Sequence, residues 1–172
     1  AAQAVCSVNN LGDYAKFRTA LNTTKSIAIM GGGLIGCEFA NDLASAGYQV
    51  TVIDPAAYPL ASLLPELAGN QLLEPLQKLA VSWRFGVSVQ AVSQSAKGYA
   101  LTLSDASTLN AEVVLSAVGL RPRIALAHEA GLAVNRGITV DDQLRSSDAD
   151  IYALGDCAEM MGRVLPYVLP IM

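Results

Sequence analysis

The sequence predicts an α/β domain whose parallel sheet lies within three layers and carries an inserted β-meander. Two observations predict this class. Residues 27–30 form an apolar run that meets a glycine-rich turn, a helical pattern and a second apolar run at 49–53, which is the order of a βαβ unit. Alternating segments at 87–94 and 99–103 then precede residues 112–118, a nearly all-apolar run typical of a strand buried on both faces.

Two segments precede the first expected strand. Residues 1–10 show no pattern and are expected to be a linker. Residues 11–21 place Leu11, Phe17 and Leu21 at helical spacing, so they predict a short amphipathic helix.

The turn after the first strand has the spacing G-x-G-x-x-G, formed by Gly31, Gly33 and Gly36. Gly31 suits a tight turn because, without a Cβ, it reaches backbone angles that other residues avoid. Gly33 removes the side chain where a pyrophosphate would approach the backbone, and Gly36 lets the helix pack closely. The N-terminus of that helix presents unpaired N–H groups and a positive dipole end to phosphates. The turn and its flanking elements therefore predict a Rossmann-like, dinucleotide-binding domain.

An acidic residue, Asp54, ends the second strand. In a βαβ unit, a carboxylate at this place accepts hydrogen bonds from the adenosine ribose hydroxyls. Between residues 51 and 77 the only charged side chains are Asp54, Glu66 and Glu74, so no cation in this stretch can meet a 2′-phosphate, which Asp54 would repel. The sequence therefore predicts NAD(H) rather than NADP(H) as the ligand.

The stretch after Asp54 predicts a loop, a helix and a strand. Residues 55–65 are loop-like, and residues 66–80 have leucines in helical register. Pro75 lies inside this helical pattern and is expected to kink or restart the helix, because proline lacks a backbone donor. Residues 81–85 predict the third strand of the sheet.

The remaining elements are shorter. Leu109 and its neighbours are a candidate for a third strand of the meander, and the α/β domain is expected to span residues 11–119. Residues 120–172 do not complete a second domain. They predict a short helix at 123–131, a short strand at 138–140, and an apolar strand at 151–154 that closes on Gly155 and Asp156.

Composition limits the classes of function. The chain has 172 residues, 52% of them hydrophobic, and a formal net charge of −4, which argues against nucleic acid or an anionic membrane surface as partner. No apolar run approaches the length that spans a membrane. Cys6, Cys37 and Cys157 form no C-x-x-C pair, so we expect small buried hydrophobes in a reducing cytoplasm, with neither a disulfide nor a metal site. The single histidine, His128, has no catalytic constellation around it.

Four segments, in chain order, carry a family resemblance: GGGLIGCEFA, VTVID, LSAVGLRPR and SSDADIYALGDCAE. Together they resemble the FAD-dependent pyridine nucleotide-disulfide oxidoreductases, which are flavoprotein reductases with two dinucleotide-binding domains. Within this family, GLIGCEFANDL, GLAVNRGI and LPYVLPIM look most like the bacterial rubredoxin reductases. The resemblance runs through nearly the whole chain.

The resemblance implies a domain plan, in which an NAD domain interrupts an FAD domain and a smaller C-terminal domain follows. Residues 11–119 would be the NAD(H)-binding domain, residues 120–160 would return to the FAD domain, and residues 161–172 would start the C-terminal domain. The family's first G-x-G-x-x-G, which holds the FAD pyrophosphate, is missing from this sequence. Most of the C-terminal domain is missing too. We therefore expect a fragment that is inactive by itself.

The resemblance also implies roles for individual residues. The glycine turn would cradle the NADH pyrophosphate, Asp54 the adenosine ribose, and residues 117–119 would form a small-residue turn that passes the bound nucleotide. Glu38 would lie near the flavin–nicotinamide junction, Asp156 would bond the ribityl chain of the flavin, and Val168 would lie near its ring. The implied cofactor-binding set is Gly31, Gly32, Gly33, Leu34, Ile35, Gly36, Glu38, Asp54, Val118, Gly119, Asp156 and Val168.

The activity implied by the resemblance is transfer of a hydride from NADH to FAD, followed by single electrons to rubredoxin or a similar small electron-transfer protein. The lack of a redox cysteine pair fits such direct transfer. Alternatives are a reductase for ferredoxin or a nitric-oxide-system rubredoxin, a non-catalytic NAD(H)-sensing module, and a structural domain whose turn binds nothing. From the residues alone, an ordinary structural role fits Glu38 and Asp156 about as well as a role in cofactor binding. In that interpretation Glu38 is a solvated acid on a helix and Asp156 is a turn residue after a strand.

Overall fold

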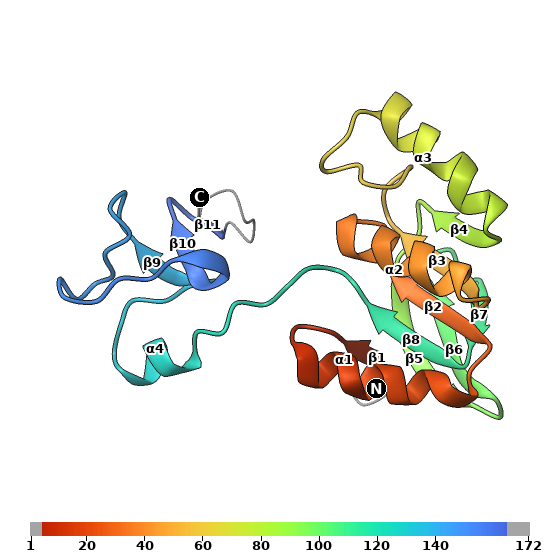
Figure 1. Ribbon diagram of the computed structural model, residues 1–172, viewed down its shortest axis with the longest axis horizontal. Helices are drawn as coiled ribbons and strands as arrows, with labels where there is room; N and C mark the ends of the chain where they lie inside the picture. Colours follow the sequence, from red (N-terminus) through yellow and green to blue (C-terminus); the bar gives the residue numbers. More distant parts are fainter. Residues whose placement is uncertain (1–4, 165–172) are drawn as a thin grey trace. The chain divides into compact units, whose positions relative to one another are not determined.

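The computed structural model describes residues 5–164 of the chain (Figure 1). The chain divides into two compact units, Ala1–Gly119 and Leu120–Met172. The glycine turn and Asp54 both lie in the first unit.

The first unit is built on a five-stranded sheet in the order β1-β8-β2-β3-β4, in which every neighbouring pair is parallel. Its strands are β1 (Val5–Ser7), β2 (Ser26–Met30), β3 (Gln49–Asp54), β4 (Val81–Phe85) and β8 (Val113–Ser116). The central strand is β2, where Ala28 lies between Thr51 of β3 and Val114 of β8. The predicted α/β class and the four predicted strands of the sheet are therefore confirmed.

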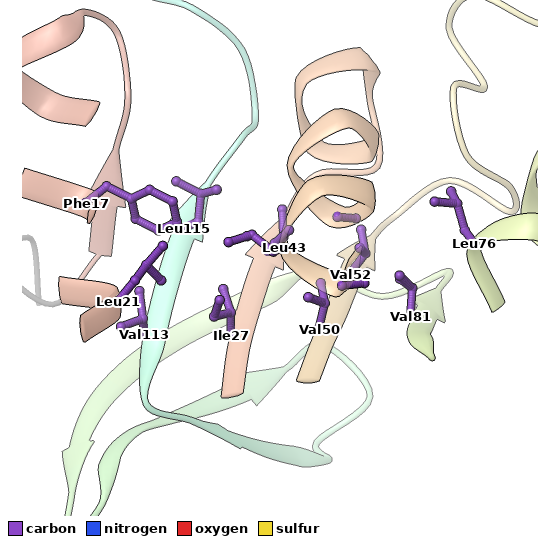
Figure 2. Packing of buried hydrophobic residues seen from close by; sticks show 13 residues of the cluster. Phe17, Leu21, Ile27, Leu43, Val50, Val52, Leu76, Val81, Val113 and Leu115 are labelled. Carbon is purple, nitrogen blue, oxygen red and sulfur yellow. The ribbon is translucent and has the colours of Figure 1, made fainter. Parts of the chain in front are cut away.

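Helices cover one face of this sheet: α1 (Leu11–Ala20) with its 3₁₀ extension η2 (Leu21–Thr23), α2 (Leu34–Ser45) and α3 (Glu66–Lys78). Alternate positions of each strand face these helices, because successive side chains of a strand point to opposite sides. Figure 2 shows the resulting core between helices and strands. Its labelled members are Phe17, Leu21, Ile27, Leu43, Val50, Val52, Leu76, Val81, Val113 and Leu115.

The meander covers the other face. It consists of the antiparallel strands β5 (Val89–Ser95), β6 (Gly98–Leu103) and β7 (Thr108–Ala111). Leu101 and Leu103 of β6 are buried in a second cluster with Ala28 and Val114 of the parallel sheet. The three layers are therefore helices, parallel sheet and meander, and the candidate strand around Leu109 is β7.

Part of the predicted linker is a strand. Val5–Ser7 forms β1 at the edge of the sheet, where Cys6 pairs with Leu115 of β8. The prediction of a linker over residues 1–10 is wrong for these residues. A three-residue strand is too short to show a period, and its partner lies far along the chain.

The structure adds detail to two predicted helices. Asn10 caps α1 by accepting a hydrogen bond from Asp13 N–H, and Phe17 is buried, but Leu11 is 85% exposed, so the apolar face is narrower than predicted. The helix α3 continues through Pro75 without a restart. Its next residue, Leu76, is buried in the core and anchors this part of the helix.

The second unit holds the helix α4 (Ala125–Glu129), the 3₁₀ turn η3 (Gly155–Cys157) and a small sheet in the order β11-β10-β9. The strands are β9 (Ile138–Val140), β10 (Ala158–Met160) and β11 (Arg163–Val164). Glu159 of β10 is buried and accepts hydrogen bonds from Gly137 N–H (2.7 Å) and from the Asn135 side chain (2.8 Å). The bond from Gly137, followed by that from Asn135, lowers the pKa of this carboxyl group. The predicted helix near 123–131 and strand at 138–140 are confirmed.

The strand predicted at 151–154 is wrong. Among the residues that the structure describes, Tyr152 makes a single bridge to Arg145, and Ile151 and Leu154 are exposed. A strand requires a neighbouring chain along its length, and this apolar run has only that one bridge.

The hairpin of β10 and β11 was not predicted from the sequence. Its turn residues Met161 and Gly162 have φ of 49° and 74°, as in the primed turns that join such strands.

Candidate functional site

The glycine turn lies at the carboxyl end of the central strand β2, where the strand order reverses between β3 and β8. Ligands of open α/β sheets bind outside the carboxyl ends of the strands at such a switch point. Gly31 begins the turn with a φ of +104°, and its N–H donates to the carbonyl of Ile53 at 2.8 Å. A Cβ on Gly31 would stand 2.7 Å from the carbonyl oxygen of Ala117, so only glycine fits here.

The other two glycines of the motif have contrasting surroundings. A Cβ on Gly36 would collide with the carbonyl oxygen of Gly31, so this glycine permits the close approach of α2 to the turn. A Cβ on Gly33 would meet no atom of the described residues within 4 Å. No packing contact of the described residues therefore requires a glycine at position 33. This position faces open space that can accommodate a phosphate of a ligand.

The N-terminus of α2 is open to that space. Gly33 is its N-cap and makes no side-chain capping bond, and the first intrahelical bond runs from Cys37 N–H to the Gly33 carbonyl at 2.9 Å. Among residues 5–164, the N–H groups of Gly33, Leu34 and Ile35 have no acceptor. Free donors at the positive end of a helix dipole are suited to a phosphate, so the arrangement fits a pyrophosphate-containing ligand.

Asp54 stands beside this turn at the end of β3, half-buried. Its Oδ2 accepts the N–H of Gly32 at 2.5 Å, and its Oδ1 accepts the N–H of Ala56 at 2.7 Å. Each carboxylate oxygen has further lone pairs, so hydroxyl donors of a ligand can still bind there. The structure brings Asp54 and the glycine turn together, and the bond to Gly32 is a contact that the motif alone does not reveal.

The loop after β3 closes on the same glycine. Leu60, at a φ of 58°, donates its N–H to the carbonyl of Gly32 at 2.8 Å. The loop is itself packed, because Pro59 is buried and Tyr58 lies against Gly69 of α3, where a Cβ would stand 2.5 Å from the Tyr58 ring. Sequence reasoning identified residues 55–65 as a loop but not this contact, for which the sequence carries no local signal.

The small-residue turn after β8 forms another side of the site. Ala117 donates its N–H to the Met30 carbonyl at 2.8 Å and so extends the pairing of β8 with β2 up to the glycine turn. Beyond it, Val118 is 69% exposed and Gly119 has a φ of +118°. Val118 and Gly119 therefore follow directly after the residue that contacts Gly31.

Glu38 is exposed on α2. It lines a cavity of about 330 Å³ between α1 and α2, together with Tyr14, Arg18 and Asp42. It also borders a cavity of about 510 Å³ that Leu34 and Leu60 line. Within residues 5–164, no hydrogen bond or ion pair fixes the Glu38 carboxylate.

Two predicted residues lie elsewhere. Asp156 is exposed in η3 of the second unit, and Val168 lies outside the described residues. His128 is exposed in the last turn of α4. No group of three or more His, Cys, Asp or Glu suited to a metal ion occurs within residues 5–164, and none of the helices in that range has the length and apolarity to cross a membrane.

The three cysteines are free thiols, but only Cys37 is buried, while Cys6 and Cys157 are half-buried. The Cys37 thiol donates to the Gly32 carbonyl at 3.4 Å. Burial, and then the neighbouring carboxylates of Asp54 and Glu38, raise its pKa to about 11. The thiol beside the glycine turn is therefore protonated at neutral pH and acts as a small packed side chain.

Known proteins resemble the chain in sequence. Rubredoxin-NAD(+) reductases of Alcanivorax borkumensis and Acinetobacter baylyi are 54% and 47% identical to it, over 98% and 96% of the chain. A nitric oxide reductase FlRd-NAD(+) reductase of Aeromonas hydrophila is 43% identical over 96% of the chain. The chain covers 44%, 43% and 43% of these relatives, respectively, so it spans less than half of their length.

Solved structures resemble it in fold. The ferredoxin reductase for the CYP199A2 system from Rhodopseudomonas palustris matches with a TM-score of 0.81 at 28% identity, over 90% of this chain and 38% of that one. The covalent putidaredoxin reductase–putidaredoxin complex matches with a TM-score of 0.79 at 30% identity, over 92% and 39%. The profile of one family matches residues 1–167, which is nearly the whole chain. The chain belongs to the pyridine nucleotide-disulphide oxidoreductase family.

Proposed function

We propose that the chain is the NAD(H)-binding part of an FAD-dependent NADH:rubredoxin oxidoreductase. The observation that carries the proposal is the glycine turn at the switch point, where free N–H groups of α2 adjoin the Asp54 carboxylate. The two rubredoxin-NAD(+) reductases, at 54% and 47% identity, support rubredoxin as the acceptor.

The residues of the first unit would hold the dinucleotide by its phosphates and ribose. The N–H groups of Gly33, Leu34 and Ile35 would bind the pyrophosphate, and Asp54 would accept the ribose hydroxyls. Val118 and Gly119, exposed beside the turn, would border the nicotinamide half. These contacts orient the ligand, since rigid backbone donors need no rearrangement on binding.

The redox chemistry would be supplied by the bound cofactors, a hydride by NADH and single-electron transfer to an acceptor by FAD, while the protein binds and orients them. Glu38 would lie at the junction of the two cofactors and Asp156 would meet the ribityl chain of the flavin; the side chains of both are exposed and so able to meet a ligand. The role suggested for Val168 falls outside the described residues.

A second acceptor has specific support. The Aeromonas hydrophila relative, 43% identical, is named a nitric oxide reductase FlRd-NAD(+) reductase. The flavin-loaded enzyme that contains this chain would distinguish the two acceptors, because NADH-dependent reduction of rubredoxin and of a nitric-oxide-system rubredoxin can be followed separately. We expect the higher kcat/KM with rubredoxin, and a preference for the nitric-oxide-system rubredoxin would reassign the acceptor.

Calorimetric titration of the chain with NADH and with NADPH tests the nucleotide site. We expect NADH to bind more tightly, because Asp54 repels a 2′-phosphate and the loop after it carries no cation. An Asp54→Ala variant should narrow the gap between the two cofactors, while Glu66→Ala, which removes an exposed charge from α3, should keep it. Equal binding of NADH and NADPH by the unaltered chain would refute the assignment of Asp54, and no binding of either would refute the proposed function.

A further inference from the structure

Gly32, the second residue of the turn, is held on both sides by the protein. Its N–H donates to Asp54 Oδ2 at 2.5 Å. Its carbonyl accepts the N–H of Leu60 at 2.8 Å and the thiol of Cys37 at 3.4 Å. The polar atoms of Gly32 are therefore occupied, and the donors left for a phosphate begin at Gly33.

The orientation of those donors depends on Gly32. The peptide group that joins Gly32 to Gly33 is planar, so the carbonyl of Gly32 and the N–H of Gly33 point in opposite directions of one rigid unit. The Gly32 carbonyl, held by Leu60, belongs to this unit, whereas the Gly32 N–H, held by Asp54, belongs to the unit before it. The two bonds together limit the rotation about Gly32 that would redirect the Gly33 N–H at the N-terminus of α2. Here Asp54 acts on one side and Leu60 on the other.

The Asp54 carboxylate, which accepts the Gly32 N–H, is itself held in place by a second hydrogen bond. Asp54 Oδ1 accepts the N–H of Ala56 at 2.7 Å, so the side chain spans the turn after β2 and the loop after β3. Its Cβ and carboxyl carbon also lie close to Gly32, because a Cβ on Gly32 would stand 3.4 Å and 3.5 Å from them. A carboxylate accepts both N–H groups with its two oxygens, whereas an amide side chain has one acceptor oxygen.

We propose that Asp54 is a positioning residue for the phosphate-binding turn, in addition to its expected contact with the adenosine ribose. The Asp54–Gly32 bond holds the peptide unit before the one that carries the Gly33 N–H, and with the Leu60 bond it sets the orientation of the turn's free N–H groups before any ligand binds. This inference rests on the proposed function and extends it, because part of the dinucleotide affinity that Asp54 provides is then independent of the ribose hydroxyls. Replacing Asp54 to change cofactor preference would also weaken phosphate binding.

The first test needs no ligand. In ¹H–¹⁵N NMR spectra of the chain, Asp54→Ala should shift the amide signals of Gly32, Gly33 and Leu34, because a charge-assisted bond is lost. Asp54→Asn, which keeps one acceptor oxygen, should shift them less, and Glu66→Ala should leave them in place. Unchanged signals of Gly32 and Gly33 in Asp54→Ala would overturn the proposal. If the amide signals of β2 and β3 in each variant match those of the unaltered chain, the sheet of that variant is folded.

The second test separates the two roles of Asp54 by changing the ligand as well. The probe is an NADH analogue whose adenosine ribose lacks both the 2′ and the 3′ hydroxyl, titrated by calorimetry. If Asp54 positions the turn, Asp54→Ala weakens binding of this analogue by about tenfold or more, since a hydrogen bond to a charged group is lost. If Asp54→Ala binds the analogue as tightly as the unaltered chain does, the positioning role is overturned and the ribose contact stands. If the unaltered chain does not bind NADH, the proposed function fails, and the NMR test still decides the positioning role.

Discussion

Substituting alanine for two glycines of the same motif should separate ligand binding from folding. A Cβ at position 33 meets open space, whereas a Cβ at position 36 collides with the carbonyl oxygen of Gly31. Gly33 has a φ of −75° and a ψ of −172°, which alanine adopts without strain. Gly33→Ala is therefore expected to alter binding alone, and Gly36→Ala to alter stability.

The magnitudes follow from these surroundings. For Gly36→Ala, overpacking costs about 1–3 kcal/mol, and the collision lies at the upper end because a backbone carbonyl cannot change rotamer. Alanine regains about 1 kcal/mol of helix propensity, so we expect a net loss of about 2 kcal/mol, or a melting temperature lower by about 4–8 °C. For Gly33→Ala, we expect a stability change within about 0.5 kcal/mol. Its methyl group would displace a phosphate from a backbone donor and weaken NADH binding by roughly 10- to 100-fold.

Both quantities can be measured on the same samples. Trp83 is the one tryptophan of the chain and packs against the core of the first unit, so its fluorescence reports unfolding of that unit. Calorimetry with NADH reports binding. A Gly33→Ala variant that binds NADH as well as the unaltered chain does would refute the placement of the pyrophosphate at Gly33. A Gly36→Ala variant of unchanged melting temperature would refute the packing argument.

Three further predictions concern single side chains. Hydrogen bonds from the N–H of Lys25 (2.5 Å) and then from that of Ser26 (3.0 Å) lower the pKa of the Glu112 carboxyl group in the folded protein. The ionised carboxylate therefore stabilises the fold fully at a pH above its ordinary pKa of about 4.3. This stabilisation is lost as the pH falls through the lowered pKa of the folded protein. Glu112→Gln should therefore lower the melting temperature at pH 7 and make little difference at acid pH. Cys37, whose pKa is raised to about 11 by burial first, should resist iodoacetamide at pH 8 until urea is added, as mass spectrometry of its peptide would show. Pro75→Ala should stabilise the first unit by about 1–3 kcal/mol in urea unfolding, because Pro75 lies exposed within a continuous helix and alanine restores one backbone bond.

Elements whose signals are local could be predicted from the sequence. The βαβ unit of β2, α2 and β3 combines two apolar runs, a helical period of 3.6 and a glycine turn within residues 26–54. The meander and the buried strand β8 show equally plain patterns. The glycine turn was predicted to follow the first strand of this unit and Asp54 to end the second, and because the two strands are parallel the structure brings these residues to one edge of the sheet.

Elements that depend on distant partners could not be predicted. The strand Val5–Ser7 exists because β8 offers it a free edge, and no pattern in three residues indicates that edge. The run at 151–154 has the composition of a strand, yet within residues 5–164 its only strand-like pairing is the bridge between Tyr152 and Arg145. The hydrogen bonds of Gly32 with Asp54 and Leu60 also join residues whose proximity follows from the fold alone.

The opposite end of the sheet also determines the geometry of the site. Glu112 precedes β8 and accepts the N–H groups of Lys25 and Ser26, which lie at the start of β2. This contact holds β8 in the register that puts Ala117 against Gly31 at the other end of the two strands. A slip of one residue would move Ala117 by about 3.3 Å and turn each β8 side chain to the wrong face. A carboxylate far from the nucleotide site thus contributes to its shape, because strands this short transmit their register from one end to the other.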